Sequence, residues 1–267
     1  MAKHSRSCDR WSTQKGRKRC IFVGALGLLA GLTPIPATAA PTRPDPVILI
    51  EGTGSSEPVV PAVDYNVLIE RLEADGYQAF VWPLPGRGLG DIRETSAAFA
   101  PFVDQVLAQT GAHRVDLIGH SQGGLVGRWY IKFLGGATKV DSFVGLATPH
   151  YGTKLANLAM LYGLADCLDY PFCQQATTGS DFLGDLNGDD DTYGQVEYTN
   201  FATRLDTIVI PYTNSFQRSP GAVNVTIQDR CPLHVVEHLG LALDGTTYSG
   251  IQDALAHRAV TLNCLAV

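Results

Sequence analysis

Short, uninterrupted apolar runs recur along this chain, and they constrain its fold more than any other feature. Val47–Ile50 is bounded by prolines and by Gly52, and similar runs lie at 78–82 and 141–147. A strand that is apolar at every position has both faces buried, which is typical of parallel sheets covered by helices. Further strands are predicted at 114–120, 196–202 and 223–227.

Amphipathic stretches separate these runs and predict helices. One helix covers 65–74, and a second begins after Asp91, where Glu94 completes a capping-box pattern, and ends at Gly111. Pro101 predicts either a kink in this second helix or its true first turn. Two more helices are predicted at 122–133 and 251–260. Strands that alternate with helices predict an α/β fold with a mostly parallel sheet, whose ligands bind at the carboxyl ends of the strands.

The first 39 residues have the composition of a secretory signal peptide. Basic residues between Lys3 and Arg19 precede an apolar run at 21–32, and Ala37-Thr38-Ala39 provides an A-x-A cleavage pattern. The alternative is a membrane anchor, but this run is too short, since a spanning helix needs about 20 apolar residues. We therefore expect cleavage after Ala39, export from the cell, and one catalytic domain formed by residues 40–267.

Removing this segment leaves an acidic chain. The full chain has 20 Lys/Arg, 26 Asp/Glu and a net charge of −6. Residues 1–39 hold seven basic residues and one acidic residue, so the remainder has 13 basic and 25 acidic residues and a net charge of −12. Such a surface repels phosphate backbones and anionic membranes. We expect no nucleic-acid partner and no stable membrane anchor, and we expect a monomer.

Four cysteines remain after residue 39: Cys167, Cys173, Cys231 and Cys264. An even number in an exported chain predicts disulfides, with three possible pairings. The short spacing of Cys167 and Cys173 favours a local bond, which leaves Cys231–Cys264. Metal ligation is the alternative, but it requires C-x₂-C spacings and nearby histidines, which the sequence lacks. We therefore predict no metal site, and the chemistry expected below requires no cofactor.

The segment Gly119-His120-Ser121-Gln122-Gly123 matches the G-x-S-x-G pattern of serine nucleophiles. It follows the apolar residues 115–118 and precedes a predicted helix, which is the context that a nucleophile elbow requires. So tight a turn strains the serine backbone and needs glycine on both sides. The alternative is a structural strand-to-helix turn with a spectator serine. We predict that Ser121 is the nucleophile.

A serine hydroxyl needs a base, and in such folds the partners follow in the order Ser, Asp/Glu, His. His238 fits best, because it follows the last strand on a segment that a Cys231–Cys264 bond would fix. His234 is the second candidate. His257 falls inside a predicted helix, and we expect it at the surface. The other histidines precede any late acid in the chain: His113, His120 and His150.

Asp206, on the loop after strand 196–202, is the predicted acid, which would accept the histidine N–H and fix its tautomer. The alternative is an ordinary turn aspartate, and Asp229 lies too close to the histidine loop to be preferred. Two backbone N–H groups must then stabilise the oxyanion. Gln122 supplies one. Thr53, in the Gly-Thr-Gly loop after the first strand, supplies the other and adds a hydroxyl donor.

Residues 148–194 depart from the alternation of strands and helices. This stretch follows the fourth predicted strand, and we expect it to run over the top edge of the sheet. It is rich in Gly and Asp and ends in the acidic run 185–191. We expect a lid-like insertion that forms a wall of the acyl pocket. The apolar residues within 154–168 can cover an acyl chain, although a core helix has the same pattern.

Five segments together resemble the class 2 secreted bacterial lipases of the α/β-hydrolase superfamily, and more distantly fungal lipase B. They lie at 48–55, 119–124, 148–153, 205–212 and 231–239. The resemblance implies an α/β-hydrolase fold, a triad of Ser121, Asp206 and His238, and an oxyanion hole at Thr53 and Gln122. One departure is Glu51, where a proline or histidine is usual. The match is weakest over 150–194, so the chain-length preference does not transfer.

Residues and resemblance predict the same activity. We expect a secreted carboxylic ester hydrolase, a triacylglycerol lipase or esterase, that works through an acyl-enzyme. One alternative keeps the triad but passes the acyl group to an alcohol. Another is a catalytically silent binding protein on the same fold.

Overall fold

Six parallel strands form a central sheet in the part of the chain that the structure describes. The computed structural model describes residues 44–54, 63–154, 157–159, 167 and 169–267. The sheet order is β2-β1-β3-β4-β5-β6, and every neighbouring pair is parallel, as predicted. The strands are β1 (Val47–Ile50), β2 (Ala79–Trp82), β3 (Val115–His120), β4 (Val140–Leu146), β5 (Glu197–Ala202) and β6 (Ala222–Thr226).

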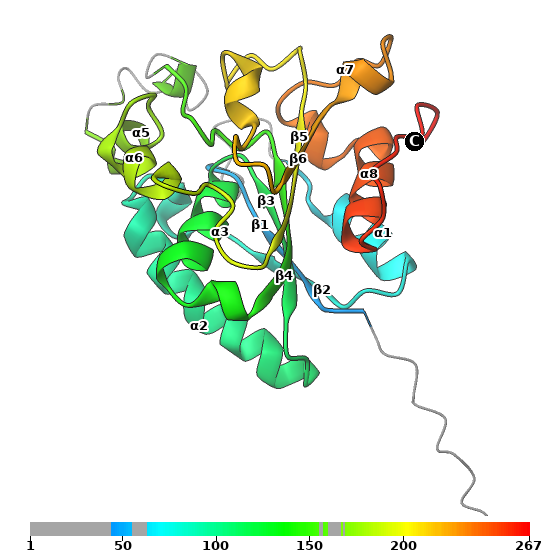
Figure 1. Ribbon diagram of the computed structural model, residues 1–267, viewed down its shortest axis with the longest axis horizontal. Helices are drawn as coiled ribbons and strands as arrows, with labels where there is room; N and C mark the ends of the chain where they lie inside the picture. The colour runs from blue at the N-terminus through cyan, green and yellow to red at the C-terminus, as the bar shows by residue number, and fades with distance from the viewer. Residues whose placement is uncertain (1–43, 55–62, 155–156, 160–166, 168) are drawn as a thin grey trace, which may run out of the picture. The chain divides into compact units, whose positions relative to one another are not determined.

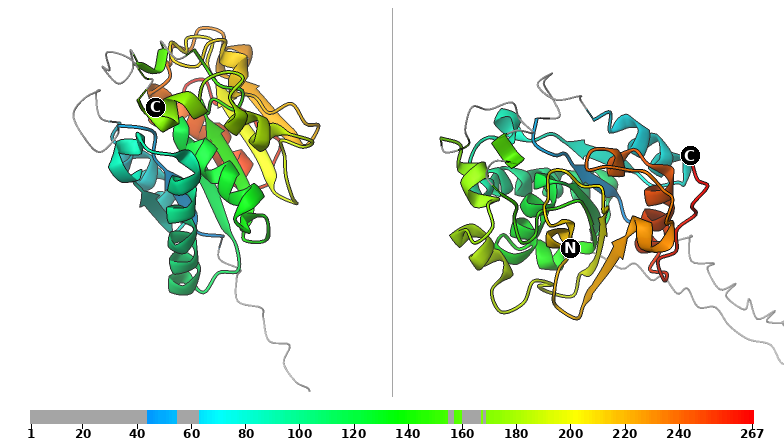
Figure 2. Two further views of the ribbon diagram at one scale, coloured as in Figure 1. Left: turned by 90° about the vertical axis from the view of Figure 1, so that its left-hand side faces the viewer. Right: turned by 90° about the horizontal axis from the view of Figure 1, so that it is seen from above.

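Helices cover both faces of this sheet (Figures 1 and 2). Helices α2 (Ile92–Thr110) and α3 (Gln122–Phe133) lie on one face, and α1 (Asn66–Ala74) and α8 (Gly245–Leu255) on the other. Alternate residues of β1 point to opposite faces, so Ile48 packs in the cluster with α2 and α3, while Leu49 packs with α1 and α8. Shorter helices are α5 (Pro171–Gln175), α6 (Asp181–Asn187), α7 (Ile227–Arg230) and the 3₁₀ turns η1 (Pro85–Gly88), η2 (Gly136–Thr138), η3 (Tyr212–Ser215) and η4 (Gly240–Ala242).

Asp91 caps the start of α2 and Gly111 ends the helix, as predicted. The Asp91 side chain accepts hydrogen bonds from the backbone N–H groups of Arg93 and Glu94, and Gly111 ends the helix with a φ of 73°. Pro101 lies inside the helix, so it does not mark the first turn. This long helix covers the sheet beside α3.

The predicted signal peptide, residues 1–39, lies outside the described residues, and its cleavage stays a prediction. Within the described residues, no helix is both long and apolar enough to cross a bilayer.

The described part of the 148–194 insertion packs as core. Phe172 of α5 and Phe182 of α6 are buried in the cluster that also contains α2 and α3. Buried Arg128 of α3 donates to the Asn187 side chain at 3.0 Å and to the Asp191 carbonyl at 2.9 Å, which holds the end of α6 on α3. Most of the apolar stretch 154–168 lies outside the described residues, so its role as a lid stays a prediction.

The last helix differs from its prediction. Helix α8 begins at Gly245 rather than at 251, because Asp244 caps it by accepting the Thr247 N–H at 2.7 Å. It ends at Leu255, so placing His257 inside a helix was wrong. His257 follows the helix with a φ of 53° and lies 3.1 Å from an Asp141 oxygen and 3.0 Å from a Glu197 oxygen.

Candidate active site

Ser121 occupies the turn between β3 and α3 with a φ of 52° and a ψ of −123°, a strained conformation for a residue other than glycine. Close approach of neighbouring atoms requires the two glycines that follow Ser121 in the chain. A methyl group at Gly123 would lie 2.2 Å from the Ile50 carbonyl oxygen, and one at Gly124 would lie 1.9 Å from Thr148 Oγ1. The elbow therefore packs against the end of β1 and the loop after β4, which fixes the position of the serine.

His238 joins Ser121 and Asp206 in one line of hydrogen bonds. Its Nε2 lies 3.0 Å from Ser121 Oγ, and its Nδ1 lies 2.9 Å from Asp206 Oδ2. Asp206 Oδ1 also accepts the backbone N–H groups of Ile208 and Val209 at 2.8 Å each, which fixes the carboxylate. The carboxylate accepts the Nδ1 proton, so Nε2 is free to receive the serine proton. The structure thus brings together three residues from three separate loops.

The two residues predicted for the oxyanion hole are in contact beside Ser121. The Thr53 hydroxyl donates to Gln122 Oε1, and both side chains are buried. Gln122 is the first residue of α3, so its N–H has no partner within the helix. The η1 turn supports the Thr53 loop, since Gly54 N–H donates to the Arg87 carbonyl at 3.0 Å. Glu51, beside this loop, is half-buried, and its burial raises the pKa of its carboxyl.

A buried chain of hydrogen bonds connects the loop of Thr53 to the segment of His238. Gly52 N–H donates to the Tyr65 hydroxyl at 2.9 Å, the hydroxyl lies 2.7 Å from His120 Nδ1, and His120 Nε2 lies 3.1 Å from the His238 carbonyl. A carbonyl can only accept, so His120 carries its proton on Nε2 and accepts the Tyr65 proton at Nδ1. Burial, and secondly the charge on His238, lower the pKa of His120 to about 3 and keep it neutral.

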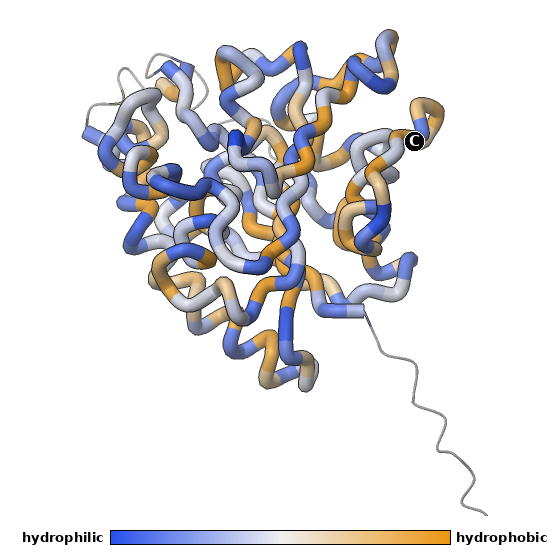
Figure 3. The backbone as a smooth tube through the Cα atoms, viewed as in Figure 1, coloured by the Kyte–Doolittle hydropathy of each residue, from blue (hydrophilic) through white to orange (hydrophobic). Residues whose placement is uncertain are grey.

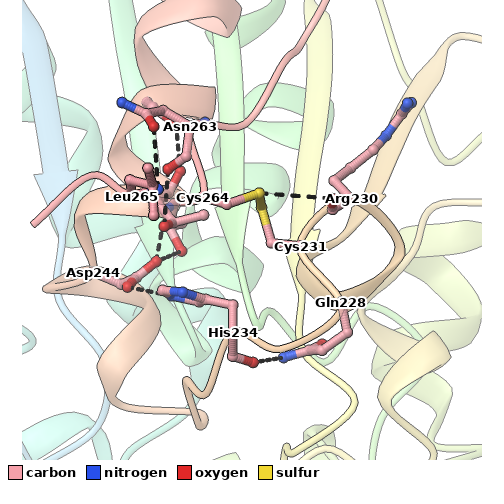
Figure 4. The surroundings of a disulfide bond; sticks show 11 residues. Gln228, Arg230, Cys231, His234, Asp244, Asn263, Cys264 and Leu265 are labelled. Atoms are coloured by element: carbon pink, nitrogen blue, oxygen red, sulfur yellow. Dashed lines mark hydrogen bonds and ion pairs between the residues drawn. A yellow bond between two sulfur atoms is a disulfide. The ribbon is translucent and has the colours of Figure 1, made fainter.

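The loop that carries His238 is braced at several points. A disulfide joins Cys231 to Cys264, and a second one joins Cys167 to Cys173. His234 Nε2 lies 2.7 Å from Asp244 Oδ1, so the second candidate base pairs with the N-cap of α8 rather than with Ser121 (Figure 4).

The remaining acid and histidine candidates either bond to other side chains or lie at the surface. Asp229 forms an exposed ion pair with Arg204. His150 is fully buried, with Nε2 2.7 Å from Asn200 Oδ1 and Nδ1 3.2 Å from Arg128. Burial and the Arg128 charge hold the pKa of His150 well below its usual value. His113 is exposed on the loop before β3.

Two of the residues described above were missed by the sequence analysis. Tyr65 gave no signal, because an aromatic residue at the start of an amphipathic helix is ordinary. Arg128 gave a weak one, since it is a charged residue within an otherwise apolar stretch of α3.

Comparisons with known proteins agree with this architecture. The lipase (class 2) family model matches residues 97–242, more than half of the 267 residues. A triacylglycerol lipase of Burkholderia plantarii is 36% identical over 141 residues, which is 51% of this chain and 38% of that protein. Another, of Pseudarthrobacter phenanthrenivorans, is 37% identical over 122 residues, or 45% of this chain and 37% of that protein.

Fungal lipases B are more distant matches. Lipase B of Pseudozyma antarctica is 28% identical over 218 residues, 79% of this chain and 61% of that protein. The chain thus matches less than two thirds of the length of each of these three relatives. The crystal structure of Aspergillus fumigatus lipase B has the same fold, with a TM-score of 0.70 at 23% identity over 85% of this chain and 56% of that chain. Because the family model covers more than half of it, the chain belongs to the class 2 lipase family.

Proposed function

We propose that this protein is an exported carboxylic ester hydrolase that acts on triacylglycerols and related fatty-acid esters. The observation that carries the proposal is the continuous line from Ser121 Oγ through His238 to Asp206, at 3.0 and 2.9 Å. Family membership and the two bacterial triacylglycerol lipases support the substrate class.

In the first half-reaction, Ser121 Oγ attacks the ester carbonyl carbon while His238 Nε2 takes the serine proton. The Asp206 carboxylate stabilises the imidazolium that results. The carbonyl oxygen becomes an oxyanion, and the backbone N–H groups of Thr53 and Gln122, with the Thr53 hydroxyl, donate to it. For that donation the hydroxyl turns away from Gln122 Oε1. The carbonyl–alkoxy bond then breaks, and His238 delivers its proton to the leaving alcohol.

In the second half-reaction, water repeats the same sequence. His238 removes a proton from water, the hydroxide oxygen bonds to the acyl carbon, and the bond to Ser121 Oγ breaks as Oγ regains the proton. The fatty acid leaves, and the resting enzyme is restored. His238 carries out every proton transfer, and the Asp206 carboxylate and the oxyanion donors stabilise the charges that form, so this scheme uses no cofactor.

Export and domain organisation belong to the same proposal. The basic and apolar pattern of residues 1–39 supports a signal peptide, and the two disulfides suit an oxidising compartment. Residues 40–267 would then form one catalytic domain, with part of 148–194 lining the acyl site.

Rates on nitrophenyl esters from acetate to palmitate test the activity and its chain-length preference. We expect turnover that disappears in Ser121→Ala, and labelling of Ser121 by an organophosphate. A fall of about thirty-fold or more at long chains would remove the lipase assignment and leave an esterase. Absence of labelling with intact folding would contradict the nucleophile itself. Product analysis with and without an added alcohol distinguishes hydrolysis from acyl transfer.

A further inference from the structure

Two buried N–H groups in the described part of the chain have no acceptor. Five buried side-chain nitrogen or oxygen atoms of these residues lack a hydrogen-bond partner, and three of the five are hydroxyls. The other two are Arg87 Nε and Gln122 Nε2, which can only donate. A buried donor without an acceptor costs free energy, and a ligand that supplies the acceptor removes that cost.

Both residues border the Thr53 loop, at the carboxyl edge of the sheet. Arg87 lies in η1, the turn that follows β2, and its carbonyl accepts the Gly54 N–H at 3.0 Å. Gln122 accepts the Thr53 hydroxyl through Oε1. Gly88 connects the two, because a methyl group there would lie 2.8 Å from Gln122 Oε1 and 3.3 Å from Thr53 Cγ2. The residue after Arg87 therefore packs directly on the two residues predicted for the oxyanion hole.

The backbone of Arg87 is held in a conformation that favours glycine. Its φ is 62° and its ψ is 12°, and the neighbouring Gly86 and Gly88 have φ values of 57° and 75°. Glycine adopts this conformation without strain, whereas arginine does so at a cost in free energy. Strained residues of this kind collect at ligand sites, so the strain favours a function for the Arg87 side chain.

The guanidinium of Arg87 carries a charge that no described carboxylate pairs with. Arg93, near the start of α2, is paired with Asp185, but no ion pair of the described residues includes Arg87. Many hydrophilic residues lie on the outer helices and loops, where they are drawn blue in Figure 3 and water hydrates their charges. Arg87 differs, because it is only partly exposed and its Nε is buried. An acceptor with a negative charge therefore fits this side chain best.

An anionic ligand needs such a cation in this protein. After residue 39 the chain has 13 basic and 25 acidic residues, so its overall field repels anions. A guanidinium beside the Thr53 loop opposes that repulsion locally. Its planar N–H groups match the paired oxygens of a carboxylate or a phosphate, whereas a neutral ester gains less from them.

We propose that Arg87, together with Gln122 Nε2, binds a negatively charged oxygen group that the ester substrate itself carries. The inference rests on the proposed function, because it names which esters Ser121 receives best. The group is a carboxylate or a phosphate joined to the scissile ester by a short chain, so that it contacts Arg87 while the ester carbonyl meets Ser121 and Thr53. A carboxylate would lie on the acyl side of the ester, and a phosphate on the alcohol side, as in a glycerophosphate that carries fatty acyl esters.

Each source of the charge is tested with a matched pair of dissolved esters. Monoethyl adipate is compared with ethyl heptanoate, in which an ethyl group replaces the carboxylate, and dibutyroyl glycerophosphate is compared with tributyroylglycerol. The readout is kcat/KM for the charged ester divided by kcat/KM for the neutral ester, so a general loss of activity cancels. A hydrogen bond to a charged group contributes about tenfold or more in affinity. We expect Arg87→Gln to lower at least one of the two ratios about tenfold or more, and Arg87→Lys to lower it less.

The matched control is Arg204→Gln, which removes an exposed cation paired with Asp229 on the loop before Asp206. It should leave both ratios within about twofold of the parent. Arg87→Gly also removes the guanidinium but suits the left-handed backbone, so it tests the same point if Arg87→Gln misfolds. A lower ratio for the adipate pair alone assigns a carboxylate, and one for the glycerophosphate pair alone assigns a phosphate. Unchanged ratios in Arg87→Gln and Arg87→Gly would overturn the inference, and so would an equal fall in Arg204→Gln.

Binding separates this inference from the proposed function. In calorimetry, Ser121→Ala protein should bind the charged ester of a pair more tightly than the neutral one, and adding Arg87→Gln should remove the difference. If the parent hydrolyses no ester, the proposed function fails, while this difference in binding still tests Arg87. Equal binding of the charged and the neutral ester in both pairs would overturn the inference.

Discussion

A single methyl group at Gly123 is predicted to damage both catalysis and stability. Its carbon would lie 2.2 Å from the Ile50 carbonyl oxygen and 2.5 Å from that of Glu51. Both neighbours are main-chain atoms at the end of β1, so relief requires a backbone shift of about 1 Å, since such contacts are normally at least about 3 Å. Overpacking of this kind costs about 1–3 kcal/mol of unfolding free energy. A displacement of about 1 Å between oxyanion donors and nucleophile costs about 10²-fold in kcat/KM.

Gly124 provides the matched comparison. A methyl group there would meet three side-chain atoms of Thr148, at 1.9 Å from Oγ1, 2.5 Å from Cγ2 and 2.7 Å from Cβ. Thr148→Ala removes the two nearest of these atoms. Gly124→Ala should therefore be partly rescued by Thr148→Ala, whereas no side-chain truncation should rescue Gly123→Ala.

The assay is kcat/KM on a dissolved nitrophenyl ester together with urea unfolding. Thr148→Ala alone is the reference, because it also removes the 3.3 Å hydrogen bond from Thr148 Oγ1 to the Gly119 carbonyl. Activity of Gly123→Ala within tenfold of the parent would refute the reasoning. Equal rescue of both glycine variants by Thr148→Ala would refute it as well.

Four further predictions follow from the site and its supports. Asp206→Asn should lower kcat about 10⁴-fold with little change in melting temperature, because the amide favours the wrong histidine tautomer. Burial raises the pKa of Asp116 to about 7, above its ordinary 3.8, so the stability it provides is full below pH 4 and lost as the pH rises through 7. Asp116→Asn should therefore be more stable than the parent at pH 8 but not at pH 4 in urea unfolding. Burial lowers the pKa of His120 to about 3, so its contribution to stability is full above pH 6.5 and lost as the pH falls toward 3. The free energy of unfolding of His120→Gln should therefore change less between pH 6.5 and pH 3 than that of the parent. Replacing Cys231 and Cys264 by serine should cost about 3–4 kcal/mol of unfolding free energy, as expected for a closed loop of this length, measured in the same assay.

The strands, and the loops that carry Ser121, Asp206 and His238, were predictable because each has a local signal. The run at β1 and the glycine-flanked serine after β3 follow from burial on two faces and from the geometry of a tight turn. Asp206 and His238 have weaker local signals, but chain order and the rule that parallel strands end at one edge bring their loops to Ser121. The sequence therefore predicted which loops meet, although it contained no distance between them.

The helices of the 148–194 insertion could not be predicted in the same way. Helices α5 and α6 are short and polar, and their stability comes from Phe172 and Phe182 buried against α2 and α3. Arg128, which holds the end of α6, donates to backbone carbonyls more than fifty residues away in the chain, such as that of Asp191. Periodicity describes which face of a helix is buried, and it cannot say which distant carbonyls will accept from a buried guanidinium.

His120, the residue before Ser121, connects the elbow to two other loops through hydrogen bonds. Through the Tyr65 hydroxyl it reaches the Gly52 N–H of the oxyanion loop, and through Nε2 it reaches the backbone of His238. Each bond in this chain has one possible direction as long as the imidazole is neutral. A proton added at Nδ1 would face the Tyr65 hydroxyl, whose oxygen already accepts from Gly52 and would have to redirect its own proton. The depressed pKa therefore favours the neutral ring, which connects the loop of Gly52, through Tyr65, to the backbone of His238.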